Sequence, residues 1–204
     1  MLERIKVGIN RGDTLVEVLF AITIFSLLAV SAMALMNRGV AVSQQSVELT
    51  SVRQHIDGQA EILRLLHGAY VGAYQPGATI PAATLAARYD DILKKYTVTA
   101  ASTFSETRSC TPPVTGRFIV NTATGAIETS VSRIVPSVTS SQIVLNSSGG
   151  FSRAEGLWVE AVRSGAAPSG GVGFTDFHVR ACWYISGSSA PMTTGTIVRL
   201  YDPS

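Results

Sequence analysis

The chain has 204 residues, enough for one domain of ordinary size together with a long helix. Only 15% of the residues are charged, while Gly, Ser, Thr and Ala are plentiful, a balance that suits an extracytoplasmic β-rich domain better than a cytosolic helical enzyme. The net charge of +2 comes from residues 1–12, which hold three basic residues and one acidic residue and leave 13 of each in the remainder. A global electrostatic affinity for nucleic acid is therefore not indicated, although a local basic patch is left open.

A short basic leader with Arg4, Lys6 and Arg11 precedes an apolar segment. Val18 to Met36 is uncharged throughout and would form about 28 Å of helix, close to the ~30 Å hydrocarbon core of a bilayer. The basic residues predict that the N-terminus stays in the cytoplasm and that the bulk of the chain lies across the membrane. The alternative is an ordinary secretory signal, cleaved near the small residues Ser31 to Ala34.

One carboxylate, Glu17, stands at the start of this apolar segment. An ionisable group in hydrocarbon costs about 2.5–3.5 kcal/mol on insertion scales, so it generally has a partner. An ordinary secretory signal does not place a carboxylate in its apolar region, which disfavours that alternative. The nearest conceivable partner for Glu17 is a chain terminus created by cleavage after Gly12.

The segment Gly12 to Leu19, Gly-Asp-Thr-Leu-Val-Glu-Val-Leu, resembles the start of a type IV prepilin or pseudopilin. The resemblance implies that a membrane peptidase cleaves after Gly12 on the cytoplasmic side and that Asp13 becomes the new N-terminus, which is often N-methylated in relatives. It also implies that Glu17 neutralises the terminal amine of a neighbouring subunit. A buried carboxylate and a buried ammonium are each costly alone and tolerable together, which agrees with that role.

Two features depart from the family pattern. Relatives mostly begin the mature chain with Phe or Met, whereas this chain begins it with Asp13, whose own charge competes for the amine. Many major pilins also carry a helix-breaking proline about twenty residues into the mature helix, and here the helix reaches Asn37 without one. Both departures favour a minor subunit over an abundant shaft subunit.

Helical patterning continues beyond the apolar segment. Apolar residues recur every seven positions, at Val42, Leu49, Ile56 and Leu63. The positions three residues after each of these hold two further apolar residues, Val52 and Leu66, and two glutamines, Gln45 and Gln59. The pattern predicts one helix from about Thr14 to Leu66, roughly 80 Å long, whose second half packs beneath a globular domain. The alternatives are a free-standing coiled coil, or a membrane anchor followed by an unrelated soluble helix.

The remainder of the chain predicts a β-rich domain. Three glycines and Pro76 between Gly68 and Gly77 predict the end of the long helix, and Pro81 to Tyr96 is patterned as a short amphipathic helix. Thr122 to Gly125 is typical of a hairpin turn. The expected strands are Arg117 to Asn121, Ile127 to Val131, Gln142 to Asn146, Leu157 to Val162, Thr175 to Tyr184 and Thr196 to Tyr201.

The expected fold is therefore α+β, with a long N-terminal helix packed against a C-terminal antiparallel sheet, as in type IV pilins. Its segments are a cleaved leader (1–12), a transmembrane and assembly half of the helix (13–36), an extracytoplasmic half (37–66) and a globular domain (67–204). In the strand from Thr175 to Tyr184, alternate residues are apolar, and this face is expected to pack on the long helix.

Cys110 and Cys182 are the only cysteines, with 71 residues between them and no His or Cys nearby at metal-ligand spacing. Outside the cytosol they predict a disulfide; the alternative is two separate buried thiols. Strand alternation places Cys182 on the face opposite the apolar one. A bridge would then tie a surface loop over the sheet, outside the core.

The sequence does not predict an enzyme, a cofactor or a metal site. Asp176 and His178 share a strand face, but no Gly-x-Ser-x-Gly nucleophile elbow accompanies them. Asp90 and Asp91 lack further acidic residues at calcium-loop spacing, so a solvated helix face is expected there. Trp158 and Trp183 are expected in the core.

The leading hypothesis is a structural subunit of a type IV pilus-like or type II secretion-like filament, held in the membrane by one helix before assembly. The resemblance implies other pilin or pseudopilin subunits, the prepilin peptidase, an inner-membrane assembly platform and membrane lipid as partners, and no small-molecule substrate. The alternative is a filament-tip binding module, an adhesin or DNA-uptake subunit, for which Arg153 and Arg163 near two Gly/Ser-rich loops are a hint.

Overall fold

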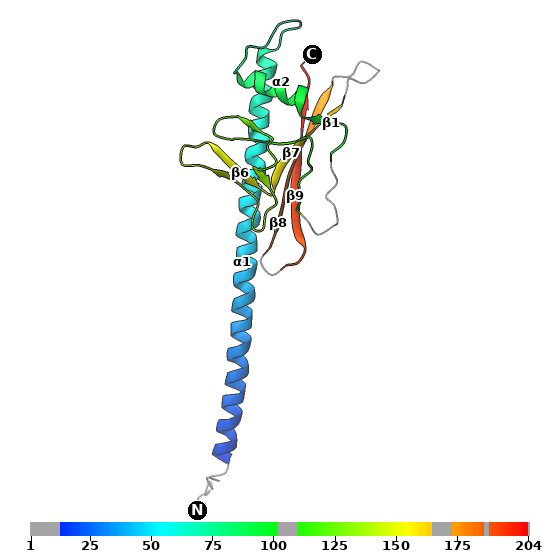
Figure 1. Cartoon of the computed structure of the whole chain (residues 1–204). Coiled ribbons are helices and arrows are strands. Elements are labelled where there is room, and N and C mark those ends of the chain that lie inside the picture. The colour runs from blue at the N-terminus through cyan, green and yellow to red at the C-terminus, as the bar shows by residue number, and fades with distance from the viewer. Residues whose placement is uncertain (1–12, 102–109, 165–172, 186–187, 204) are drawn as a thin grey trace, which may run out of the picture. The chain divides into compact units, whose positions relative to one another are not determined.

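The computed structural model describes residues 13–101, 110–164, 173–185 and 188–203. The chain divides into two compact units, Met1–Ser46 and Val47–Ser204. Helix α1 (Asp13–Ala73) provides the described part of the first unit and the beginning of the second. The second unit also holds α2 (Leu85–Lys95) and strands β1 to β9 (Figure 1). The strands are β1 (Thr97–Val98), β2 (Arg117–Val120), β3 (Ile127–Glu128), β4 (Ile134–Val135), β5 (Gln142–Leu145), β6 (Phe151–Glu155), β7 (Leu157–Ser164), β8 (Phe174–Tyr184) and β9 (Pro191–Tyr201).

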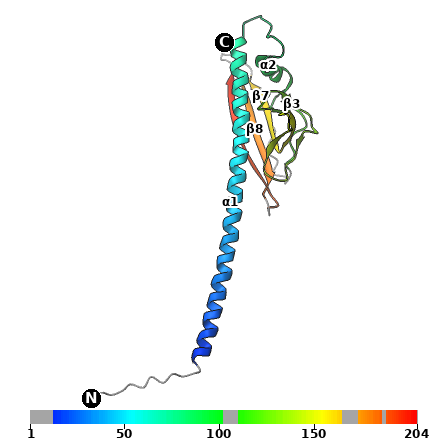
Figure 2. The ribbon, with the colours of Figure 1, turned by 90° about the vertical axis from the view of Figure 1, so that its left-hand side faces the viewer.

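The strands form two sheets. The larger has the order β3-β2-β7-β8-β9, with β1 pairing beside β7, and the smaller has the order β4-β6-β5. Neighbouring strands are antiparallel except for the pairs β1–β7 and β4–β6. From Val47 onward, α1 lies along the larger sheet, beside β7 and β8 (Figure 2). The expected α+β fold, with a long N-terminal helix on a largely antiparallel sheet, is confirmed.

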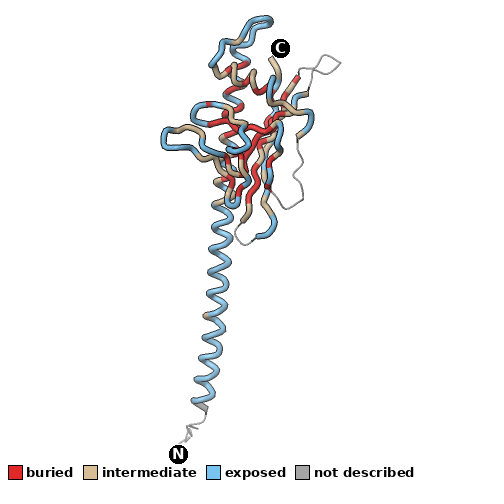
Figure 3. Tube along the Cα trace, in the orientation of Figure 1, coloured by how far each residue is buried: buried red, intermediate tan, exposed pale blue. Residues whose placement is uncertain are grey.

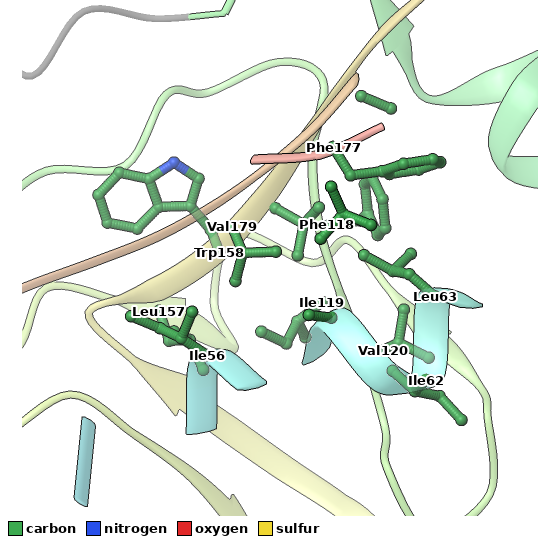
Figure 4. Packing of buried hydrophobic residues seen from close by; sticks show 14 of the residues in the cluster. Ile56, Ile62, Leu63, Phe118, Ile119, Val120, Leu157, Trp158, Phe177 and Val179 are labelled. Carbon is green, nitrogen blue, oxygen red and sulfur yellow. The ribbon is translucent and has the colours of Figure 1, made fainter. Parts of the chain in front are cut away.

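The seven-residue stripe of α1 packs on this sheet from Leu49 onward. Val52, Ile56, Leu63 and Leu66 are buried in one hydrophobic core. Figure 4 shows Ile56 and Leu63 directed toward the inward-facing side chains of β2, β7 and β8, which include Phe118, Leu157 and Val179. Burying such a side chain contributes about 1.5–3 kcal/mol, so these contacts are a main source of stability of the second unit.

The predicted end of the long helix is wrong by about two turns. We expected the helix to end near Leu66, but α1 continues to Ala73. Leu66 and Tyr70 are buried, so packing holds the last turns in place. A Cβ added at Gly68 or Gly72 would meet open space, and these glycines therefore cost only intrinsic helix propensity.

The predicted second helix is confirmed, but it begins later than expected, at Leu85. Thr84 is its N-cap, and the Thr84 hydroxyl accepts a hydrogen bond from the Ala87 N–H at 3.1 Å. Pro81, expected in the first helical turn, lies before the cap. The buried face comprises Ala86, Tyr89, Ile92 and Leu93.

All six predicted strands are present, but their first or last residues differ from those predicted. The hairpin turn after β2 is confirmed by the bond from Gly125 N–H to the Asn121 carbonyl, at 2.7 Å. The strand expected from Ile127 to Val131 has only two residues, and β9 begins five residues earlier than predicted, at Pro191. Strands β1, β4 and β6 were not anticipated as separate elements.

Strand β8 alternates as predicted over most of its length. Its apolar positions are buried, including Phe177, Val179 and Trp183, and Trp158 on β7 is buried as well. Cys110 and Cys182 form the disulfide, with Cα atoms 5.3 Å apart. Each cysteine is only 2% exposed, so the bridge is buried and belongs to the core cluster, not to a surface loop as expected. Pro112, two residues after Cys110, is buried as well.

Candidate functional site

The N-terminal part of α1 presents its apolar side chains to the surroundings. The large apolar residues between Leu15 and Met36 are 53–72% exposed, and this stretch is pale blue in Figure 3. A soluble helix would hide such residues on one side, but here they occur all round the helix. Such a surface is compatible with surroundings of hydrocarbon or of other apolar helices.

Within the described residues, α1 is the one helix long and apolar enough to cross a membrane, by length and composition. The part of the chain described from Leu15 onward is thus compatible with a single-pass membrane protein. Polar groups in such a helix need internal partners, because lipid offers none.

Three hydroxyl side chains in this segment meet that requirement within the helix itself. Thr23 donates to the Phe20 carbonyl at 2.8 Å, Ser26 to the Ile22 carbonyl at 2.7 Å and Ser31 to the Leu27 carbonyl at 2.8 Å. The hydroxyls are thereby satisfied without a second chain. They leave no hydrogen-bonding demand that would fix a neighbour.

Glu17 differs from these hydroxyls. It lies on the exposed surface of α1, and among the described residues it makes no hydrogen bond or ion pair. Gly12 lies outside the described residues, and Asp13 is the first residue of α1. The described chain thus brings no positive group to Glu17, and any partner must come from elsewhere.

Other candidate side chains have structural partners. Arg199 binds the Asp176 carboxylate through two bonds of 2.8 and 2.7 Å and holds the pKa of Asp176 below its ordinary value. Desolvation and the nearby Arg180 lower the pKa of His178. Asp176 and His178 thus share one face of β8, where Asp176 is paired with Arg199 of β9.

The acidic and basic residues singled out elsewhere are also paired. Asp90 and Asp91 lie on α2 and pair with Lys94 and Lys95 one turn later, as a solvated helix face would. Arg153 pairs with Glu155 at 2.7 Å, and Arg163 with Asp202 at 3.1 Å. These two arginines therefore offer no uncompensated charge to a phosphate backbone.

The structure also contains a pocket that was not anticipated. It has a volume of about 240 Å³ and lies where α1 ends and the chain turns toward α2. Its lining includes Tyr70, Tyr74, Gln75, Thr79, Asp90 and Lys94. The signal in the sequence was a pair of tyrosines before a Gly/Pro turn, which by itself predicts only the end of a helix.

No family model, no curated protein and no solved structure matches the chain.

Proposed function

We propose that the chain is a structural subunit, a minor pilin or pseudopilin, of a type IV pilus-like or type II secretion-like filament. It is made as a membrane protein, processed after Gly12 by a prepilin peptidase, and assembled by packing of its N-terminal helix against those of other subunits. The globular unit then lies on the extracytoplasmic side.

The observation that carries the proposal is the all-round apolar surface of the N-terminal part of α1, together with Glu17, a carboxylate in this part that has no partner among the described residues. Apolar helices in lipid gain nothing from hydrophobicity alone when they associate, so polar pairing across chains gives association its specificity. The hydroxyls of Thr23, Ser26 and Ser31 already donate to carbonyls of their own helix, so they have no free donor for such pairing. The carboxylate of Glu17 can accept hydrogen bonds from a donor on another chain.

The partner that fits Glu17 is the amine of Asp13 in a neighbouring subunit, exposed by cleavage. A carboxylate and an ammonium brought together in an apolar medium attract each other strongly, and each relieves the desolvation cost of the other. The pair forms only after processing, because before cleavage Asp13 has an amide in place of an amine. Processing thereby becomes a condition for assembly.

The test uses cells that carry the native assembly machinery. Glu17→Ala should leave the protein in the membrane, with its leader removed, and lower its amount in sheared filaments at least about tenfold. Glu61→Ala is the matched control, because Glu61 is an exposed carboxylate on the same helix that pairs with Arg64. Equal incorporation of Glu17→Ala and wild type would refute the assembly role of Glu17.

Processing is tested by mass spectrometry of the N-terminus. The expected mature chain begins at Asp13, and a peptidase-deficient strain should retain Met1. A mature chain that begins beyond Ser31 would show an ordinary secretory signal and would overturn the proposal as a whole.

A further inference from the structure

The pocket at the end of α1 is concave, aromatic and polar at once. Tyr70 is buried and Tyr74 is partly exposed, and their rings are tilted with centroids 5.9 Å apart. Tyr70 is fixed from behind by Tyr89 of α2, whose ring centroid is 5.1 Å away. Tyr70 is therefore held in position by the core, and Tyr74 packs against it from the exposed side.

Several polar side chains line the same pocket, and four of them have no hydrogen-bond partner in the described part of the chain. Within the described part of the chain, no hydrogen bond is made by the hydroxyls of Tyr70, Tyr74 and Thr79 or by the amide of Gln75. Hydroxyls and amides each offer both a donor and an acceptor. A ligand with several groups that donate and accept would satisfy them together.

The charges of the pocket cancel. Asp90 and Lys94 pair across one turn of α2, with Oδ2 and Nζ 2.5 Å apart, and they are the charged groups in the lining. A cation would have to compete with Lys94 for the carboxylate, and an anion with Asp90 for the ammonium. The pair still offers free lone pairs and N–H donors to a neutral ligand.

These features select the ligand class. We propose that this pocket binds a neutral saccharide unit, with one face of the sugar ring against the exposed ring of Tyr74 and its hydroxyls bonded to Gln75, Thr79 and the Asp90–Lys94 pair. Aromatic walls with a few placed polar groups are typical of small-molecule sites, and the volume of about 240 Å³ is below the range of about 300–1,000 Å³ for drug-sized ligands, so it suits a single ring. The proposal concerns binding without a reaction, and it does not depend on filament assembly.

The experiment uses the full chain in a polyoxyethylene detergent, because detergents with sugar head groups would compete. Saturation-transfer NMR is recorded with glucose, galactose, mannose, N-acetylglucosamine and N-acetylgalactosamine, and with tetramethylammonium and inorganic phosphate as charged probes. At least one sugar is expected to receive saturation and to give a measurable Kd. The charged probes are expected to give no transfer.

Variants then locate the site. Tyr74→Ala, Gln75→Ala and Asp90→Asn should each weaken sugar binding by about fivefold or more, because they remove the aromatic surface, a hydrogen-bonding amide and a charged acceptor, respectively. Asp91→Asn is the matched control: it breaks the adjacent ion pair with Lys95, which lies outside the pocket lining, and should leave the Kd within about twofold. Circular dichroism of each variant confirms that α1 and α2 are retained.

Three results would overturn the proposal. The first is the absence of saturation transfer to every sugar at millimolar concentration. The second is binding that Tyr74→Ala and Gln75→Ala leave unchanged, or that Asp91→Asn weakens as much as Asp90→Asn. The third is transfer to tetramethylammonium or phosphate in place of the sugars, which would assign the pocket to an ion.

Discussion

The side chain of Gln59 binds the backbone of Val120 in both directions. Gln59 Nε2 donates to the Val120 carbonyl at 2.7 Å, and the Val120 N–H donates to Gln59 Oε1 at 3.0 Å. Both residues are fully buried. A helix side chain thus completes the hydrogen bonding of the last residue of β2, where the chain leaves the strand, and fixes α1 in register with the sheet.

Gln59→Leu should destabilise the second unit by about 2–4 kcal/mol, because the Val120 N–H and carbonyl would be left buried without partners. Equilibrium urea unfolding of the full chain, followed by the fluorescence of buried Trp158 and Trp183, measures this loss. Gln45→Leu is the control: Gln45 lies on the same helix but is exposed, so a change within about 0.5 kcal/mol is expected. A Gln59→Leu variant as stable as wild type would show that the two bonds contribute no net stability.

Gly156 joins β6 to β7 at a point with no room for a side chain. Its φ is +60°, and an added Cβ would collide with the Cys182 carbonyl and lie 2.6 Å from Ser137 Cβ. Gly156→Ala should therefore cost at least about 3 kcal/mol in the same unfolding assay. Gly149 also has a positive φ, of +76°, but open space around it, so Gly149→Ala isolates the backbone strain and should cost only about 1 kcal/mol. Equal losses in the two variants would contradict the role of the collision.

Removal of the disulfide should lower stability by about 2–4 kcal/mol, since the bridge joins residues separated by 72 positions and restricts the unfolded chain. The measurement compares wild type with the double variant Cys110→Ala and Cys182→Ala. A reducing agent should destabilise wild type and leave the double variant unaffected. If reduction changed both proteins equally, the effect would have another origin.

Acidification from pH 7 to pH 5 should lower stability through two histidines. Burial lowers the pKa of His55 and of His178, and Arg180 lowers the latter further. Below pH about 6.5 the unfolded chain therefore takes up protons that the folded chain resists, so stability falls as pH falls. The double variant His55→Gln and His178→Gln should lose less stability over this range, as measured by thermal unfolding at each pH.

Asp176 does not interfere with that comparison. Arg199 lowers the pKa of Asp176, so its contribution to stability is present above its unfolded pKa of about 3.9 and is lost only at more acidic pH. A steeper loss of stability in the double variant than in wild type between pH 7 and pH 5 would contradict the histidine mechanism.

Sequence periodicity was sufficient to predict an element where that element is long and has one buried face. The seven-residue stripe of α1 and the alternation of Phe177, Val179 and Trp183 both follow from burial against a single layer. Helix ends were predicted less well, because several neighbouring residues can begin or end a helix and the sequence does not show which of them does so. Pro81 suited a first turn, but the Thr84 hydroxyl caps the helix three residues later.

The remaining features depend on residues far apart in the chain. Gln59 interrupts an apolar stripe, and its burial makes sense only beside Val120, 61 residues away. The pocket combines α1, the following turn and α2, so no local pattern predicts it. Glu17 is the opposite case: as an isolated charge in an apolar segment it was conspicuous in the sequence, and the described chain adds only that it has no partner there.

The disulfide also determines how this chain would respond to tension. Strands β2 to β7 and most of β8 lie between Cys110 and Cys182, inside one covalent loop, whereas α1, α2, β1 and β9 lie outside it. If the chain is pulled at both ends, the segment within the loop adds no length while the bridge is intact. About 240–260 Å of fully extended chain is withheld in this way. Such a subunit yields under load only by peeling away the elements outside the loop, which include β1 and β9 of the larger sheet, while the smaller sheet and the rest of the larger one stay within it.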